Sequence, residues 1–319
     1  MRQTAVGRET LSVKVLHTFR MVVLPLLVPA LLIGASFFAP GVSLYRIFAT
    51  ILLGLWYYYS YFVLTVLRNL HLQRLALELC DFDAYQSCME FLEHFNIGRA
   101  AICRQKVNSI DAFLIRGDFD EAYRRLMEIR DEKPNFAPAT ELVYDYYWCR
   151  FYAELEDFHN FELCLEYFRN RWLRGRNVSR RSLRNATMLQ QELEFREMMF
   201  QGKNIQAKEY LSKVYRSGSL ESKYEFLRYC YFMGRVEFAL ANFNVAKHWF
   251  AQAVSFRIRE HMSKRAAEFL AQIDAMQIPY AEHVPMYNEP HYHEHPLRMW
   301  SNLFGIILGL VCIVVMYGM

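Results

Sequence analysis

The sequence lacks the short motifs that mark most catalytic sites. It contains no G-x-S-x-G nucleophile elbow, no phosphate-binding glycine loop, no dinucleotide fingerprint and no H-E-x-x-H zinc motif. Isolated histidines, such as His94, His159 and His248, are typical of helix surfaces and helix caps. The sequence therefore predicts no enzymatic activity and no cofactor.

Paired cysteines are also missing. The seven cysteines are an odd number, form no C-x-x-C pair and show no regular spacing. Disulfide frameworks and zinc sites need such pairs. We therefore expect free thiols in a reducing compartment.

Three long apolar runs lack charge. Residues 21–39 and 47–67 are each long enough to cross the ~30 Å hydrocarbon core of a bilayer, and residues 301–319 end the sequence. A basic stretch precedes the first run and the second run follows closely, so the pattern favours an uncleaved hairpin over a signal peptide. The sequence predicts a cytoplasmic tail (1–19), a transmembrane hairpin (20–67) and a C-terminal transmembrane helix (300–319).

Basic residues around these runs predict their orientation. Arg8, Lys14 and Arg20 precede the first run, and Arg68 and Arg74 follow the second. Lys and Arg are retained on the cytoplasmic side of a membrane. We therefore expect the chain between the hairpin and the last run to lie in the cytoplasm.

Residues 68–278 lack the alternation typical of strands and contain few prolines, which predicts helices throughout. Five segments align: CDFDAY at 80, GDFDEA at 117, EDFHNF at 156, GKNIQA at 202 and ANFNVA at 241, with starts 37, 39, 46 and 39 residues apart. Gly117 suits a tight turn because it adopts positive φ without steric cost. After it, one apolar helix face is predicted from Phe119, Ala122, Tyr123, Leu126 and Ile129.

These segments resemble the tetratricopeptide repeat, with its Gly-Asp/Asn-aromatic-x-x-Ala element. The matching positions are Gly117, Ala122, Gly202, Ala207 and Ala246, whereas Cys80, Glu156 and Ala241 replace the glycine, and Tyr85 and Phe161 the alanine. The resemblance implies an all-α fold with a solenoid of helix pairs at residues 68–277. It also implies a concave groove that binds a peptide or a partner helix. A plain helical bundle is the alternative.

The stretch RNRWLRGRNVSRRSLRN, residues 169–185, holds seven arginines and no acid, and lies where the repeat spacing rises to 46 residues. It could bind an acidic protein through bidentate guanidinium groups or anionic lipid. It could also be a solvated face paired with Glu192, Glu194 and Glu197. Nucleic acid is the least favoured ligand because a single aromatic residue is available for stacking. The candidate binding residues are Arg169, Arg171, Trp172, Arg174, Arg176, Arg180, Arg181 and Arg184.

Residues 278–299 are rich in proline and histidine, which predicts an extended linker. His291, His293 and His295 alternate, so in an extended chain they share one side. They could bind Zn²⁺, Cu²⁺ or Ni²⁺, or sense mild acidification. A polar linker at the level of the lipid headgroups is the alternative.

The run WYYYSYF, residues 56–62, places four tyrosines inside the second apolar run. Hydroxyl groups in hydrocarbon need partners, so we expect them to face the other spans. Lipid or ligand binding between the helices is an alternative to simple packing.

Together these patterns predict a membrane-anchored scaffold in a bacterial inner membrane. Its cytoplasmic solenoid would dock a protein partner, and its arginine-rich loop would contact acidic protein or anionic lipid. A juxtamembrane metal-binding or pH-sensing protein and a lipid-binding membrane factor are the alternatives, and an organelle tail anchor is the alternative location.

Overall fold

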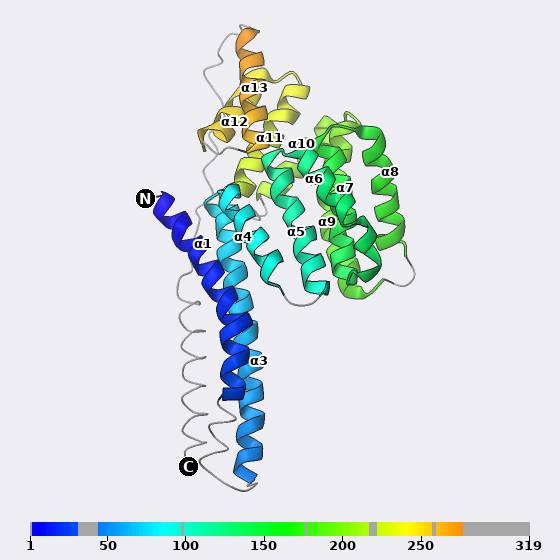
Figure 1. The fold of residues 1–319 in the computed structure, drawn as a ribbon. Coiled ribbons are helices and arrows are strands. Elements are labelled where there is room, and N and C mark those ends of the chain that lie inside the picture. Colours follow the sequence, from blue (N-terminus) through cyan, green and yellow to red (C-terminus); the bar gives the residue numbers. More distant parts are fainter. Residues whose placement is uncertain are drawn as a thin grey trace. The chain divides into compact units, whose positions relative to one another are not determined.

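The computed structural model describes residues 2–30, 44–96, 99–175, 178–216, 222–256 and 260–276. All regular elements among these residues are helices, which confirms the prediction of an all-α protein (Figure 1). They belong to two compact units, with the boundary between Leu75 and Ala76. The predicted linker with His291, His293 and His295 and the predicted helix at 300–319 lie outside the described residues.

The described residues of the first unit form two long helices. They are α1 (Arg2–Thr18), which continues through the π-helical turn η1 (Phe19–Val23) and residues 24–30, and α3 (Leu44–Gln73). The N–H of Leu24 donates to the carbonyl of Phe19, five residues back. Pro25 comes next, and a proline removes one helical hydrogen bond while its ring collides with a carbonyl of the preceding turn. The widened turn lets the helix pass through Pro25 without ending.

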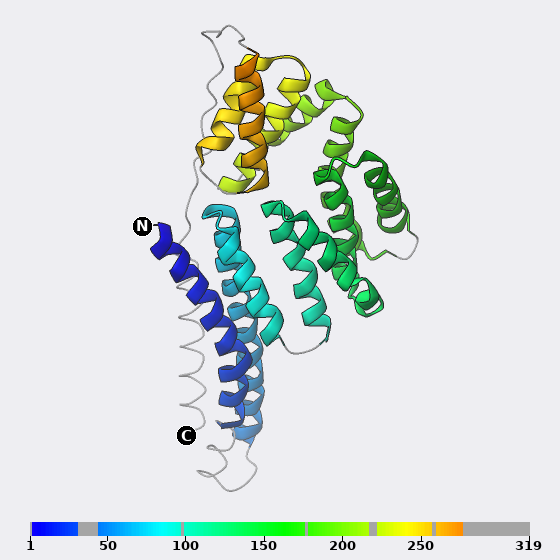
Figure 2. The ribbon, with the colours of Figure 1, turned by 45° about the horizontal axis from the view of Figure 1, so that its top comes forward.

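α1 and α3 run antiparallel and side by side in both views (Figure 1 and Figure 2). Polar contacts join them at three levels, which are Glu9 with His71, His17 with Arg68, and Arg20 with Thr65. Beyond these levels Leu24, Leu53, Trp56 and Leu64 form an apolar cluster. The pair is therefore polar at one end and apolar at the other.

One helix among the described residues, Gln3–Ala30, is long and apolar enough to cross a bilayer. It begins well before the predicted run at 21–39, so most residues of the predicted tail are helical. The predicted run at 47–67 forms the middle of α3. The two-span hairpin and the third span remain predictions.

The second unit is a succession of helices that contact their neighbours along the chain. They are η2 (Arg74–Glu78), which crosses the unit boundary, α4 (Phe82–Phe95), α5 (Arg99–Arg116), α6 (Phe119–Glu128), η3 (Arg130–Asn135), α7 (Pro138–Glu154), α8 (Phe158–Phe168), η4 (Arg169–Leu173), α9 (Arg180–Phe200), α10 (Asn204–Arg216), α11 (Lys223–Ala239), α12 (Phe243–Ser255) and α13 (His261–Ala275).

Four helix pairs of this unit close with the same turn. The turn residues have positive φ and are Gly117 (78°), Glu156 (58°), Gly202 (68°) and Ala241 (59°). In each turn this residue donates its N–H to the carbonyl three residues back, and the next residue donates to the carbonyl five residues back. This is the Schellman arrangement of a helix end. The fifth aligned position, Cys80, also has positive φ, so all five aligned positions share this feature of the backbone.

The small residues of the repeat are deeply buried. Ala122, Ala207 and Ala246 expose no surface, and Phe161 occupies the equivalent position in α8 with none exposed either. On the predicted face of α6, Leu126 is likewise inaccessible, but Tyr123 is 46% exposed. That stripe is therefore narrower than the sequence predicts, and Tyr123 points away from the core.

Candidate functional site

The first half of the arginine-rich stretch is neutralised within the fold. Arg169 makes a bidentate contact with Glu197, at 3.0 and 2.7 Å. Arg171 pairs with Glu141 at 2.6 Å, and Arg174 with Glu166 at 2.9 Å. The expected pairing with Glu197 is present, whereas Glu192 contacts other arginines.

Trp172 is buried in the turn η4. Its indole N–H donates to Asp145 at 2.9 Å. Because the ring packs inside the unit, it offers no surface on which a base could stack. This arrangement weakens the nucleic-acid interpretation further.

The arginines of α9, in the second half of the stretch, are unpaired within the described part of the chain. Arg180, Arg181 and Arg184 are exposed in the first two turns of α9 and make no ion pair within the described part of the chain. The first turn of α9 holds no acidic residue, so the positive end of the helix dipole adds to their charge. Leu183 and Met188 are exposed beside them. Arg176 lies outside the described residues.

A second group of arginines is largely buried, and we call it the arginine network. It consists of Arg150, Arg196, Arg228, Asp111, Glu154 and Glu192, from α5, α7, α9 and α11. Arg196 and Glu154 are 2.7 Å apart. Burial opposes the ionisation of Glu192, but the nearby guanidinium groups of Arg228 and Arg196 outweigh it and hold its pKa well below the usual range. Three cations face three carboxylates, so the network is balanced and joins the first helices of successive pairs.

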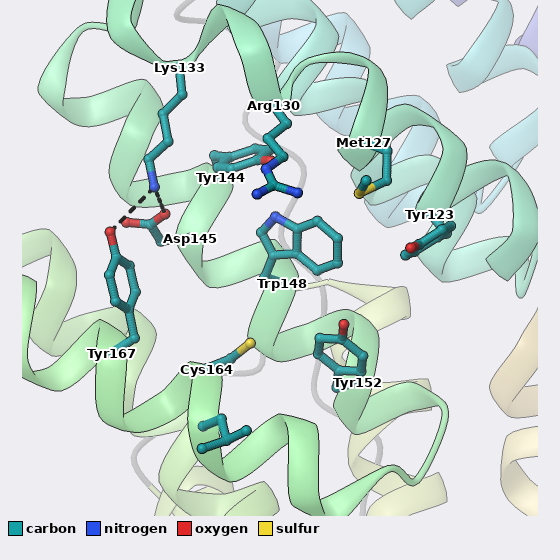
Figure 3. Close-up of a pocket in the computed structure, with 11 residues that line it drawn as sticks. Tyr123, Met127, Arg130, Lys133, Tyr144, Asp145, Trp148, Tyr152, Cys164 and Tyr167 are labelled. Carbon is teal, nitrogen blue, oxygen red and sulfur yellow. Dashed lines mark hydrogen bonds and ion pairs between the residues drawn. The ribbon is translucent and has the colours of Figure 1, made fainter.

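A groove with a cavity of about 480 Å³ lies between α6, η3, α7 and α8 (Figure 3). We call it the α6–α8 groove. Its lining residues are Tyr123, Met127, Arg130, Lys133, Tyr144, Asp145, Trp148, Tyr152, Leu163, Cys164 and Tyr167.

The walls of the groove are aromatic and aliphatic side chains spaced one helical turn apart. On α7 the ring planes of Trp148 and Tyr152 stack with centroids 5.8 Å apart. Tyr123, Met127, Leu163 and Tyr167 are 46, 38, 58 and 47% exposed. Large apolar side chains gathered in this way are typical of interaction surfaces.

One end of the groove is polar. Lys133 donates to Asp145 at 2.8 Å, and its ammonium group lies 5.5 Å from the ring centroid of Tyr144 and 5.3 Å from that of Tyr167. Burial raises the pKa of Asp145, although Lys133 and Trp172 both donate hydrogen bonds to it. The sequence predicts Trp172 and Arg171 as binding residues. In the structure they contact Asp145 and so stabilise the polar end of this groove.

Arg130 differs from the other charged residues of the groove. It is exposed, and it makes no ion pair with any residue that the structure describes. Figure 3 shows its guanidinium group beside the ring of Trp148. The groove therefore carries one uncompensated positive charge next to its aromatic wall.

The described cysteines are free, and Cys164 alone among them is not buried. It lines the groove, and burial raises the pKa of its thiol to about 11. Because Cys164 lies in the lining, its alkylation can report whether the groove is occupied, and the raised pKa means that the reaction needs alkaline pH. Among the described residues no three His, Cys, Asp or Glu side chains gather to hold a metal ion.

The α6–α8 groove was not predicted from the sequence. The segment YDYYWCRFY, residues 144–152, is unusually aromatic, and Tyr144, Trp148 and Tyr152 recur every four residues. That recurrence was the available signal. Comparison with protein-family models, curated proteins and solved structures finds no match.

Proposed function

We propose that the protein is a membrane-anchored adaptor of the tetratricopeptide-like type, which docks a segment of a partner protein at the cytoplasmic face of a bacterial inner membrane. The shared turn geometry, the buried alanines and the chain of contacting helix pairs support a repeat solenoid. The apolar helix Gln3–Ala30 and the charge-free middle of α3 support a membrane hairpin.

The α6–α8 groove is the observation that carries the docking role. It combines a cavity with the stacked rings of Trp148 and Tyr152, the partly exposed rings of Tyr123 and Tyr167, and an unpaired arginine. Partner anchors bind best in such pockets, where aromatic residues and arginine contribute most of the energy.

The free basic surface of α9 is proposed as a second contact. Arg180, Arg181 and Arg184 would attract an acidic protein surface or anionic headgroups, and Leu183 and Met188 would add apolar contact.

Photo-crosslinking in native membranes tests the docking role. A photoreactive amino acid at Met127 should yield a defined adduct with one partner polypeptide. The same residue at Ile205, which is 66% exposed on α10, is the matched control and should not yield it. Identical products from both positions would contradict the proposal.

A further inference from the structure

The charges around the α6–α8 groove indicate the charge of the ligand that would occupy it. Lys133 and Arg171 together engage the two carboxylates at the polar end, which are those of Asp145 and Glu141. These four charges balance. Arg130 is the remaining charge, so an occupant that supplies a carboxylate would neutralise the groove.

A cationic occupant is disfavoured, although the groove is lined by aromatic rings. Such rings attract cations at their faces. Here the ammonium group of Lys133 already lies near the ring centroids of Tyr144 and Tyr167. A second cation would meet the positive charges of both Lys133 and Arg130.

Besides a carboxylate, the occupant needs a large apolar side chain, and the positions of the groove residues show where it would lie. Figure 3 shows Arg130 next to Trp148, with Met127 and Tyr123 on the same side of the groove and Tyr152 further along α7. A carboxylate held by Arg130 brings the adjoining side chain of the occupant against this wall. A cavity of about 480 Å³ is in the range that holds a small ligand or a few side chains, and not a folded domain.

We infer that the α6–α8 groove binds a short extended peptide segment in which a large apolar residue stands next to Asp or Glu, with the carboxylate on Arg130 and the apolar side chain against Trp148. This inference rests on the proposed docking function and specifies its partner. A charge-assisted bond from a planar guanidinium group would give the acid preference.

Peptide display against the full-length protein in detergent micelles tests the inference. Random seven-residue peptides with a blocked carboxyl end should be selected for Trp, Phe, Leu or Met beside Asp or Glu. Changing that acid to its amide should weaken binding by about tenfold or more, the usual size of a charge-assisted hydrogen bond. R130Q should weaken binding to the same extent and R130K to a smaller one. R104Q removes an arginine on α5 that is likewise exposed and makes no ion pair with any described residue, and it should leave binding unchanged.

Two readouts separate the inference from the function on which it rests. Selected peptides should slow the alkylation of Cys164, measured by mass spectrometry of the Cys164-containing fragment. If peptides protect Cys164 but show no acid preference and bind R130Q equally well, the inference is overturned and groove docking stands. If the selected peptides do not protect Cys164 and bind a Y123A/L163A variant with unchanged affinity, both the inference and the proposed groove docking are wrong.

Discussion

The arginine network and the α6–α8 groove are built from the same kinds of side chain, arginine and aromatic residues, but they differ in how their charges are paired. In the network, three guanidinium groups face three carboxylates, and Tyr146 adds a hydrogen bond to Glu192. In the groove, Arg130 has no acidic partner among the described residues, and the rings of Tyr123 and Tyr167 are 46 and 47% exposed. Arginine and aromatic content therefore does not distinguish a structural region from a binding surface in this protein. The pairing of charges and the exposure of the rings do.

Removing one guanidinium group from the network should have the largest effect. Arg196→Met leaves Glu154 buried with a weaker contact to Arg150, 3.9 Å away. Breaking a buried pair on one side costs about 3 to 5 kcal/mol. Urea unfolding of the purified full chain should show this loss, whereas Arg130→Met should change stability by less than about 0.5 kcal/mol.

A double variant checks the cause of that loss. Arg196→Met combined with Glu154→Gln removes the stranded charge and should recover much of the stability. If Arg196→Met alone is as stable as the unchanged chain, the network is not structural and the contrast with the groove fails.

The second prediction compares two glutamates whose pKa values are shifted in opposite directions. Glu260 caps α13 by accepting the N–H of Ser263 at 2.8 Å, but its other oxygen has no partner and burial raises its pKa to about 7. An acid whose pKa is raised on folding destabilises the fold increasingly as pH rises from its unfolded pKa of about 4.3 to its folded one. Glu260→Gln keeps an acceptor for the cap, and it should therefore stabilise the protein by on the order of 2 kcal/mol at pH 8 and by less at pH 5.

Glu192→Gln is the matched control, for which we expect a change in stability of the opposite sign. The pKa of Glu192 is depressed by the arginines, so its stabilisation is present above the unfolded pKa and is lost as pH falls through the folded one. This variant should be less stable than the unchanged chain at pH 8, and the deficit should shrink below about pH 4. Unfolding curves with the same sign for both variants would contradict the assignment.

The third prediction separates stability from binding. Gly202→Ala places a Cβ where no atom lies within 4 Å, so its cost comes from the positive φ alone and should be roughly 1 kcal/mol. Ala241→Gly relieves the same strain and should stabilise by roughly 0.5 kcal/mol. Neither turn touches the groove, so peptide affinity should not change. A change in affinity would show that the groove depends on the distant turns.

The helix-pair turns could be predicted from the sequence because their geometry is local. The hydrogen bonds of such a turn span no more than five residues, and the sequence alignment places Cys80, Glu156 and Ala241 in register with the glycines, whose positive φ they share. The all-α fold follows from the same periodic signal.

The division of the arginine-rich stretch into a first half with ion pairs and a second half without them could not be predicted. Arg171 meets Glu141 and Arg169 meets Glu197, partners about thirty residues away that only the packing of helix pairs brings together. Tyr123 shows the same limit. Helical periodicity assigned it to the core stripe of α6, but the face it occupies turns outward and forms a wall of the groove.

Truncating the groove wall should have the smallest effect on stability and the sharpest effect on binding. Leu163 is exposed, so Leu163→Ala removes little buried surface and should change stability by less than about 0.5 kcal/mol. Ile205→Ala is the matched control, because Ile205 is similarly exposed on another helix. We expect both variants to unfold like the unchanged chain, and we expect Leu163→Ala alone to weaken peptide affinity and peptide protection of Cys164. Equal affinity in the two variants would mean that Leu163 is an ordinary exposed side chain, and the contrast between groove and network would then rest on Arg130 alone.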